Sequence, residues 1–127
     1  MQLVAIAAGG AMGAVFRYLV SNGVYQWLGR GFPWGTLVVN VMGSLLMGVL
    51  FVLLTERLAL DGFWKAFLMV GFLGAFTTFS TFSLETLQLI EEGALLRALL
   101  NVVGSVVLCV VAAWGGVAMG RLLWGSP

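Results

Sequence analysis

The stretch GFLGAFTTFSTFSLE, from Gly71 to Glu85, sets hydroxyls and phenyl rings into a chain built mostly of Leu, Val, Ala and Gly. Phe76, Phe79 and Phe82 recur every third residue, so they would share one face of a helix. Threonine is β-branched, and Ser and Thr hydroxyls can bond to the backbone, so the run favours a local interruption that Gly74 would permit. A helix broken at membrane depth is tolerated only where it lines a cavity or is buried in protein. The stretch therefore predicts a broken helix at a functional site.

The composition is that of an integral membrane protein. The 127 residues are 61% hydrophobic and 9% charged, with a mean hydropathy of +1.09. A soluble domain carries roughly 25% charged residues, so this chain has too few to cover a surface in water. Histidine is absent and Cys109 is the only cysteine, which excludes His-based and Cys-cluster metal sites and an internal disulfide. The net charge of +1 does not indicate nucleic-acid binding, and we expect none.

Four segments are apolar enough to cross a bilayer, which takes about 20 mostly apolar residues. We expect them at residues 3–20, 34–54, 63–90 and 95–123, so that residues 1–127 form a single four-helix transmembrane domain. The start of the chain resembles a signal peptide but lacks a basic segment before its apolar run, so it is interpreted as the first span. Trp27 and Trp34 fall in the connection after that span, where indole rings suit the lipid–water interface.

Basic residues are divided almost evenly between the two sides that these spans define. One side holds Arg57, Lys65 and Arg121, and the other holds Arg30 and Arg97. Because the Lys/Arg bias sets orientation, a near balance fits a chain that inserts both ways and pairs as an antiparallel dimer. A weak bias that still selects one orientation fits the same count.

Glycines four residues apart predict close packing of helices. Gly9 with Gly13 and Gly116 with Gly120 form two GxxxG patterns, a spacing that lets helix backbones approach. Four helices enclose little interior, so we expect an oligomer. The same glycines would also serve to pack helices within one subunit, and both interpretations stay open.

Polar residues follow two spans at helical spacing. They recur at every fourth residue: Thr36, Asn40 and Ser44 in the second span, and Asn101, Ser105 and Cys109 in the fourth. Polar groups at membrane depth usually face a bundle interior or a water-filled cavity. The alternatives are a hydrogen bond between helices for Asn40 and a bond to the local backbone for Ser105.

The charges in the spans point to an anion as the ligand. The midpoints of the four spans hold no Asp, Glu or Lys, and Glu85 is the only carboxylate placed to lie within a span. Cation pores use rings of carboxylates, whereas hydroxyl and amide donors with phenyl-ring edges, which carry the positive end of the ring quadrupole, suit a small anion. Arg17, near the end of the first span, either extends to the interface or attracts anions to the mouth of a pathway.

The chain resembles the Fluc/CrcB family of fluoride channels in two segments taken together, GTLVVNVMGS (Gly35–Ser44) and GFLGAFTTFSTFSLE. The resemblance covers nearly the whole chain, and the core TFSTFS (Thr78–Ser83) is specific when GTLVVN precedes it. It implies an all-α membrane protein with four transmembrane helices and a break in the third, assembled as an antiparallel dual-topology homodimer. It further implies two fluoride pores, a structural sodium ion at the dimer centre, and a multi-pass location in the inner (plasma) membrane of a prokaryote, surrounded by lipid. Passive fluoride export would then give fluoride resistance.

The resemblance also implies roles for individual residues. Phe79 and Phe82 would turn their ring edges towards fluoride, and Asn40 would donate hydrogen bonds to the ion. The rest of the pathway would be formed by Ser80, Thr81, Thr36, Glu85, Ser105 and Arg17. Backbone carbonyls of Gly74 and Thr77, from both subunits, would bind sodium. Phe76 has no such role, and we expect it to pack in the core.

One position departs from the family pattern, and two other functions fit parts of the sequence. Asn101 stands where the family often has a Tyr, so an amide would replace a phenol in the polar track.

A small four-helix proton-coupled drug antiporter has a similar size, but it needs a carboxylate in the first span, which has Arg17 and no Asp or Glu. A non-conducting scaffold explains the glycines but not the alternation of Phe with hydroxyls. Enzyme activity is not expected, since no buried acid pair and no nucleophile with a base partner is present.

Overall fold

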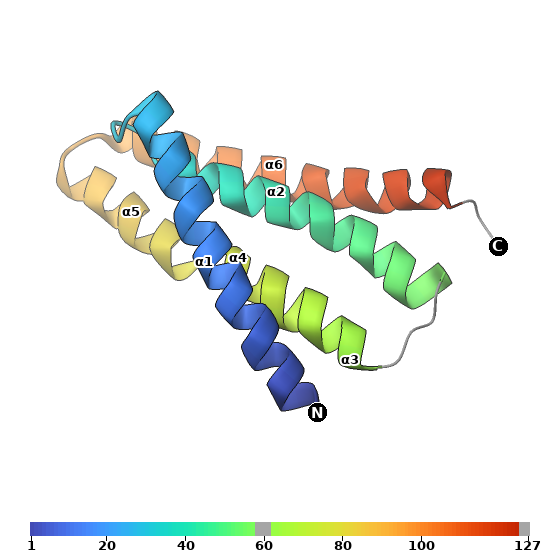
Figure 1. The fold of residues 1–127 in the computed structure, drawn as a ribbon. Helices are drawn as coiled ribbons and strands as arrows, with labels where there is room; N and C mark the ends of the chain where they lie inside the picture. Colours follow the sequence, from blue (N-terminus) through green and yellow to red (C-terminus); the bar gives the residue numbers. More distant parts are fainter. Residues whose placement is uncertain (58–61, 125–127) are drawn as a thin grey trace.

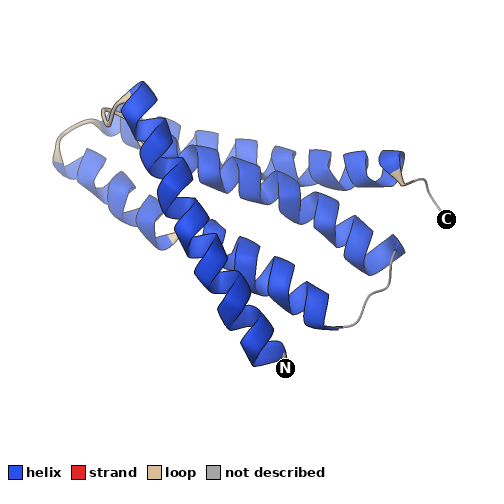
Figure 2. Cartoon of the chain, viewed as in Figure 1, coloured by secondary structure: helices blue, strands red, loops and turns tan. Residues whose placement is uncertain are grey.

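The part of the chain that the structure describes contains four helices that are apolar enough to cross a membrane, as the sequence predicts (Figure 1). The computed structural model describes residues 1–57 and 62–124, and in this part of the chain every regular element is helical (Figure 2). The helices long and apolar enough to cross a membrane are Gln2–Leu28, Trp34–Glu56, Gly62–Glu91 and Leu95–Leu123. The protein is therefore a multi-pass membrane protein.

The first helix, α1 (Gln2–Leu28), continues past the end that was expected near Val20. The polar residues that follow Val20 include no proline, so the backbone hydrogen bonds of the helix can continue through them. The helix ends at Gly29, whose φ of 79° suits glycine and whose N–H bonds the Tyr25 carbonyl. Trp27 consequently lies on the helix and not in the connection after it.

The second and fourth spans lie side by side (Figure 1). They are α2 (Trp34–Phe51), which continues into the π-helical segment η1 (Val52–Arg57), and α6 (Leu95–Leu123). A Cβ atom at Gly48 would collide with the Ala113 carbonyl, and one at Gly116 would collide with the Leu45 carbonyl. The two backbones therefore touch at these glycines, and a side chain at either position would force the helices apart.

The third span is built from four short pieces and is crossed by α1 (Figure 1). The pieces are α3 (Gly62–Lys65), the π-helical segment η2 (Ala66–Leu73), α4 (Gly74–Phe76) and α5 (Ser80–Glu91). Cβ atoms at Gly9 and Gly13 would collide with backbone atoms of Phe67 and Phe72. Both GxxxG pairs thus contact helices of the same chain, which confirms the interpretation that they pack helices within one subunit.

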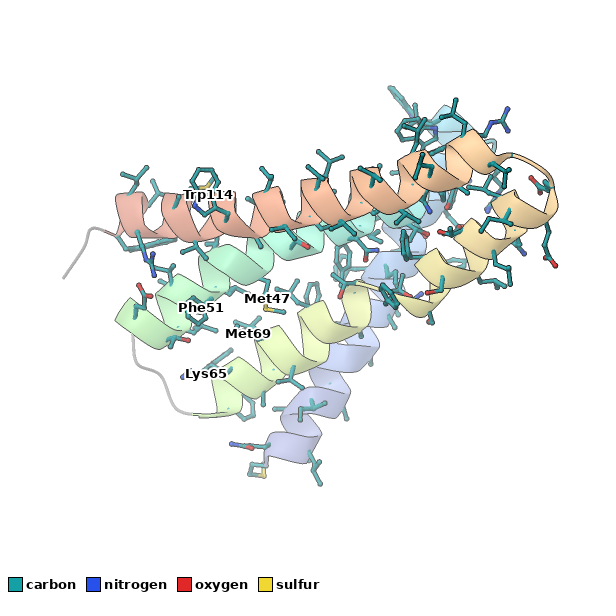
Figure 3. All side chains as sticks on the ribbon, turned by 180° about the vertical axis from the view of Figure 1, so that it is seen from behind. Met47, Phe51, Lys65, Met69 and Trp114 are labelled. Carbon is teal, nitrogen blue, oxygen red and sulfur yellow. The ribbon has the colours of Figure 1, made fainter. Side chains whose placement is uncertain are left out.

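The two helix pairs diverge towards the chain termini. Figure 3 shows Met47 and Phe51 of α2 on the side that faces Lys65 and Met69 of the third span. Trp114 lies on the outer side of α6. In this half of the molecule α2 and the third span therefore face each other through these side chains.

A small buried cluster lies where α2 meets the third span. Val39, Leu73 and Phe76 form it, and the Phe76 ring stacks on Phe72 with centroids 6.0 Å apart. Only 3% of Phe76 is exposed, which confirms that this phenylalanine packs in the core. Directly after it, Thr77 takes an extended conformation (φ −87°, ψ 158°), and helical structure resumes at Ser80. The cluster therefore anchors the chain just before residues 77–79 pass beside α2.

Candidate functional site

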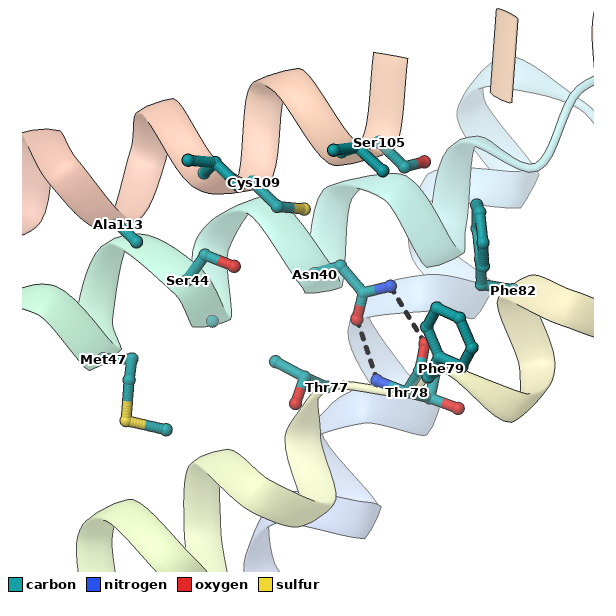
Figure 4. Close-up of a pocket in the computed structure, with 13 residues that line it drawn as sticks. Asn40, Ser44, Met47, Thr77, Thr78, Phe79, Phe82, Ser105, Cys109 and Ala113 are labelled. Atoms are coloured by element: carbon teal, nitrogen blue, oxygen red, sulfur yellow. Dashed lines mark hydrogen bonds between the residues drawn. The ribbon is translucent and has the colours of Figure 1, made fainter. Parts of the chain in front are cut away.

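An open groove of about 420 Å³ lies between α2, α6 and the start of α5 (Figure 4). Its walls come from three spans: Asn40, Gly43, Ser44 and Met47; Thr77, Thr78, Phe79 and Phe82; and Ser105, Val106, Cys109, Val110 and Ala113. The polar stripes of the second and fourth spans thus meet across one space, and none of the lining residues is Asp, Glu, Lys or Arg. A ligand in this groove would therefore meet neutral side chains and no fixed charge.

The side chain of Asn40 is paired with the backbone of Thr78 (Figure 4). Asn40 Nδ2 donates to the Thr78 carbonyl at 3.0 Å, and Asn40 Oδ1 accepts from the Thr78 N–H at 2.8 Å. One of the two interpretations of Asn40, a hydrogen bond between helices, is therefore confirmed. A carboxamide has two N–H donors, and the bond to Thr78 uses one of them. The second is left for a ligand in the groove.

Two phenyl rings stand together at one end of the groove (Figure 4). The ring centroids of Phe79 and Phe82 are 5.4 Å apart, with the planes at 39°. Phe79 is 77% exposed and Phe82 is half-buried, in contrast to the buried Phe76. Most of Phe79 and part of Phe82 are therefore open to a ligand or to a partner.

The start of α5 is held by the Thr78 hydroxyl. Thr78 Oγ1 accepts from the Thr81 N–H at 3.2 Å and donates to Thr81 Oγ1 at 3.1 Å. The first of these bonds satisfies an N–H that the first turn of a helix leaves without a partner. Ser80 is exposed and Thr81 is half-buried, and neither is among the residues that line the groove.

Around the extended Thr77, two carbonyls do not have the partners of a continuous helix. In a continuous helix the Thr78 N–H would bond the Gly74 carbonyl, and the Thr81 N–H would bond the Thr77 carbonyl. Here those N–H groups bond to Asn40 Oδ1 and Thr78 Oγ1 instead. The carbonyls of Gly74 and Thr77 thus lose these donors, and oxygen ligands of this kind suit a hard cation. Among the described residues no three metal-ligating side chains gather, so a cation here would depend on the backbone.

A second polar cluster joins α1, α2 and α5. Glu85 accepts a hydrogen bond from Tyr25 Oη at 2.6 Å and one from Thr36 Oγ1 at 2.5 Å. Around it is a smaller pocket of about 170 Å³ lined by Tyr25, Arg30, Pro33, Glu85, Gln88, Leu89 and Glu92. The Arg30 guanidinium stacks over the Tyr25 ring, 4.4 Å from its centroid. Thr36 and Glu85 therefore lie in this cluster and not on the wall of the groove.

Tyr25 was not identified from the sequence. The polar residues after Val20 predict a connection at this position, whereas the segment forms the last turns of α1. Arg17, Ser21 and Tyr25 follow at every fourth residue, the spacing that marked the other two stripes. Extending the first helix would therefore have added Tyr25 to the candidates.

Arg17 and Asn101 lie outside the groove lining. Arg17 Nε donates to the Ala75 carbonyl at 3.1 Å, so this cation binds the end of α4 from the side of α1. Asn101 is buried and donates to Thr86 Oγ1 at 2.8 Å, and Thr86 is a second residue that the sequence did not single out. Of the fourth-span stripe, Ser105 and Cys109 line the groove.

The chain is similar to one described family and to several named proteins. Residues 4–117 match the family model described as CrcB-like protein, Camphor Resistance (CrcB). A protein of Magnetococcus marinus named fluoride-specific ion channel FluC is 58% identical over 123 residues, which cover 97% of this chain and 100% of that protein. A relative of the same name from Methylococcus capsulatus is 60% identical over 97% of this chain and 54% of its own length. Another from Coxiella burnetii is 51% identical over 97% of this chain and 100% of its own.

Proposed function

The chain belongs to the CrcB-like family, and we propose that it is a fluoride-selective ion channel that exports fluoride passively and so confers fluoride resistance. The structural observation that carries the proposal is the uncharged groove in which the Phe79–Phe82 ring pair adjoins the Asn40 amide. The relatives named fluoride-specific channels cover nearly the whole chain. A channel is not an enzyme, and the drug antiporter receives no support from these relatives or from a first span without Asp or Glu.

Fluoride holds its water shell tightly, so a pore must replace that shell with converging donors. In the proposed channel the Asn40 N–H that is not bonded to Thr78 provides one donor. The ring edges of Phe79 and Phe82 provide positive quadrupole density next to it. The Ser105 hydroxyl, on the opposite wall, provides another contact. Movement follows the electrochemical gradient of the ion.

The pathway extends beyond the groove in this proposal. Thr36 and Glu85 form a vestibule, where the Tyr25–Glu85–Thr36 hydrogen bonds fix the side chains in place. Ser80 and Thr81 continue the polar track along α5, and Arg17 contributes a positive charge. A cation near a pathway raises the local concentration of anions.

We also propose that two copies assemble antiparallel around a sodium ion. The support for the ion is the pair of carbonyls, at Gly74 and Thr77, whose helical donors bond elsewhere. The break of the third span is the element that would present these oxygens at membrane depth. A partner subunit would cover the exposed Phe79 and close the open side of the groove. The dimer would lie in lipid, in the inner membrane of a prokaryote, and the relatives named above are bacterial.

The cellular role is tested by survival. A bacterium without its own fluoride channel, transformed with this chain, is expected to grow at fluoride concentrations that stop the untransformed strain. The matched control is the same chain with Phe79→Ile, made at equal membrane abundance. Equal fluoride sensitivity with and without the wild-type chain would contradict the proposed export.

Assembly needs a separate measurement. Light scattering of the purified protein in detergent is expected to give twice the mass of one 13.5 kDa chain after subtraction of the detergent. A mass of one chain at all protein concentrations would contradict the dimer.

A further inference from the structure

Three hydrogen bonds run in sequence behind the groove, from α6 to α5. Ser105 Oγ donates to Asn101 Oδ1 at 3.3 Å, and Asn101 Nδ2 donates to Thr86 Oγ1 at 2.8 Å. Thr86 Oγ1 in turn donates to the Phe82 carbonyl at 2.8 Å. The residues at the two ends, Ser105 of α6 and Phe82 of α5, both line the groove, and the two in the middle do not. The row therefore connects one wall of the groove to the other.

The middle of this row is deeply buried. Asn101 is 2% exposed, Ser105 is 7% exposed and Thr86 is 9% exposed. Loss of a hydrogen-bond partner by a buried polar group lowers the stability of the folded protein, because neither lipid nor nearby protein replaces the bond. The row thus has little freedom to rearrange while the helices stay packed.

The bonding pattern fixes which way the Asn101 amide points. The Thr86 proton is used on the Phe82 carbonyl, so Thr86 Oγ1 can offer Asn101 only an acceptor. Nδ2 must then face Thr86, and Oδ1 must face Ser105. As a result the Ser105 proton is directed away from the groove towards Asn101. The Ser105 contact is the longest of the three, so it is the one that an arriving anion can replace by turning the hydroxyl.

We infer that Asn101 is a positioning residue for the pore, acting through Ser105 and Phe82. It holds the Ser105 hydroxyl in place by a long bond that an anion can replace, and through Thr86 it holds the backbone of Phe82 at a fixed distance from α6. The width of the groove between the phenyl wall and α6 then selects for a small ion. This inference rests on the proposed channel function.

Removal of the amide is expected to widen the groove and lower selectivity. Asn101→Leu keeps a side chain of similar size but makes no hydrogen bond. In liposomes we expect fluoride efflux to fall about tenfold, which corresponds to about 1.4 kcal/mol in barrier height, and chloride efflux to rise above wild type. A residue that only stabilised the fold would lower the yield of folded protein but would leave the fluoride-to-chloride ratio unchanged. Asn22→Leu on α1, which makes the same replacement at a half-buried residue that takes no part in the row, is the control.

The second arm asks whether Asn101 acts through Thr86. Thr86→Val should lower the fluoride-to-chloride ratio in the same way, and Thr86→Ser, which keeps the hydroxyl, should restore it. Adding Asn101→Leu to Thr86→Val should change the ratio little, since both remove the same connection. Thr55→Val on the exposed part of η1 is the control for this substitution.

The outcomes separate the inference from the proposed function. A wild-type protein that releases no fluoride would overturn both. If the wild type conducts fluoride but Asn101→Leu or Thr86→Val leaves the fluoride-to-chloride ratio unchanged, only the positioning role is overturned. The positioning role is also overturned if the effects of the two substitutions on this ratio add in the double variant. If Asn101→Leu does not fold, the Thr86→Val and Thr86→Ser pair decides the question.

Discussion

Asn40 holds the backbone of Thr78 by both ends of its carboxamide, with 3.0 Å from Nδ2 to the carbonyl and 2.8 Å from Oδ1 to the N–H. One side chain of the second span thus bonds both backbone groups of Thr78, the residue that follows the extended Thr77. The same side chain lines the groove. Holding the Thr78 backbone is therefore a structural role of this amide, and offering its second N–H to an ion is the role that we propose for it.

Loss of the Asn40 amide should impair both functions. In Asn40→Ala the Thr78 carbonyl and N–H lose their partners, which costs about 1–3 kcal/mol for each group that stays buried and unpaired. We expect fluoride efflux from liposomes to fall at least about tenfold and the melting temperature in detergent to drop. Asn22→Ala, on α1, is the control and should change neither quantity. An Asn40→Ala protein with the wild-type rate would remove this residue from the route of the ion.

The three phenylalanines of the central stretch should separate into two kinds. Phe79→Ile and Phe82→Ile remove rings at the groove, so fluoride efflux should fall while the melting temperature stays near that of wild type. Phe76→Ala removes a buried ring stacked on Phe72 and should cost about 3 kcal/mol of stability. Efflux and thermal unfolding are measured on the same preparations. Normal efflux in both groove variants would argue against rings that line the path.

Tyr25 should matter through its hydroxyl. Tyr25→Phe removes the donor to Glu85 and leaves the ring under Arg30 in place, so we expect a loss of about 1–2 kcal/mol of stability and slower efflux. Tyr18→Phe, on the same helix at a position that is 65% exposed, is the matched control. The two variants are compared by thermal unfolding and by efflux. Indistinguishable behaviour of the two would exclude a role for the Tyr25–Glu85 bond.

Two adjacent glycines on α6 should respond in opposite ways to the same substitution. At Gly116 an added methyl would collide with the Leu45 carbonyl, whereas nothing lies within 4 Å of a Cβ at Gly115. Gly116→Ala should therefore separate α2 from α6 and lower the melting temperature. Gly115→Ala should be neutral or raise stability by up to about 1 kcal/mol, because alanine favours the helix. Equal melting temperatures for the pair would contradict the close approach of the two backbones.

The parts of this account that the sequence predicts are those set by local pattern. The lengths of the apolar runs located four membrane helices, and the spacing of Asn40, Ser44, Ser105 and Cys109 placed two polar stripes that the fold brings to one groove. The end of α1 was missed because polar residues after Val20 imitate a loop, although nothing in them stops a helix before Gly29.

Pairings between distant residues were beyond the reach of local pattern. Tyr25 and Glu85 are 60 residues apart in the chain, and only the crossing of α1 over the third span brings them together. The place of Thr86 likewise depends on how α5 lies against α6, which spacing along one helix does not specify. Ser80 and Thr81 belong to the hydroxyl-rich stretch, yet the turn at residues 77–79 leaves them off the groove lining, and their part in conduction stays a prediction.

The central claim is tested most directly by ion release from liposomes that contain the purified protein. Vesicles loaded with fluoride and with chloride are compared, with an electrode selective for each ion and with empty vesicles as the blank. The account predicts fast release of fluoride and retention of chloride. Retention of fluoride by a folded protein, or equal release of both ions, would contradict it.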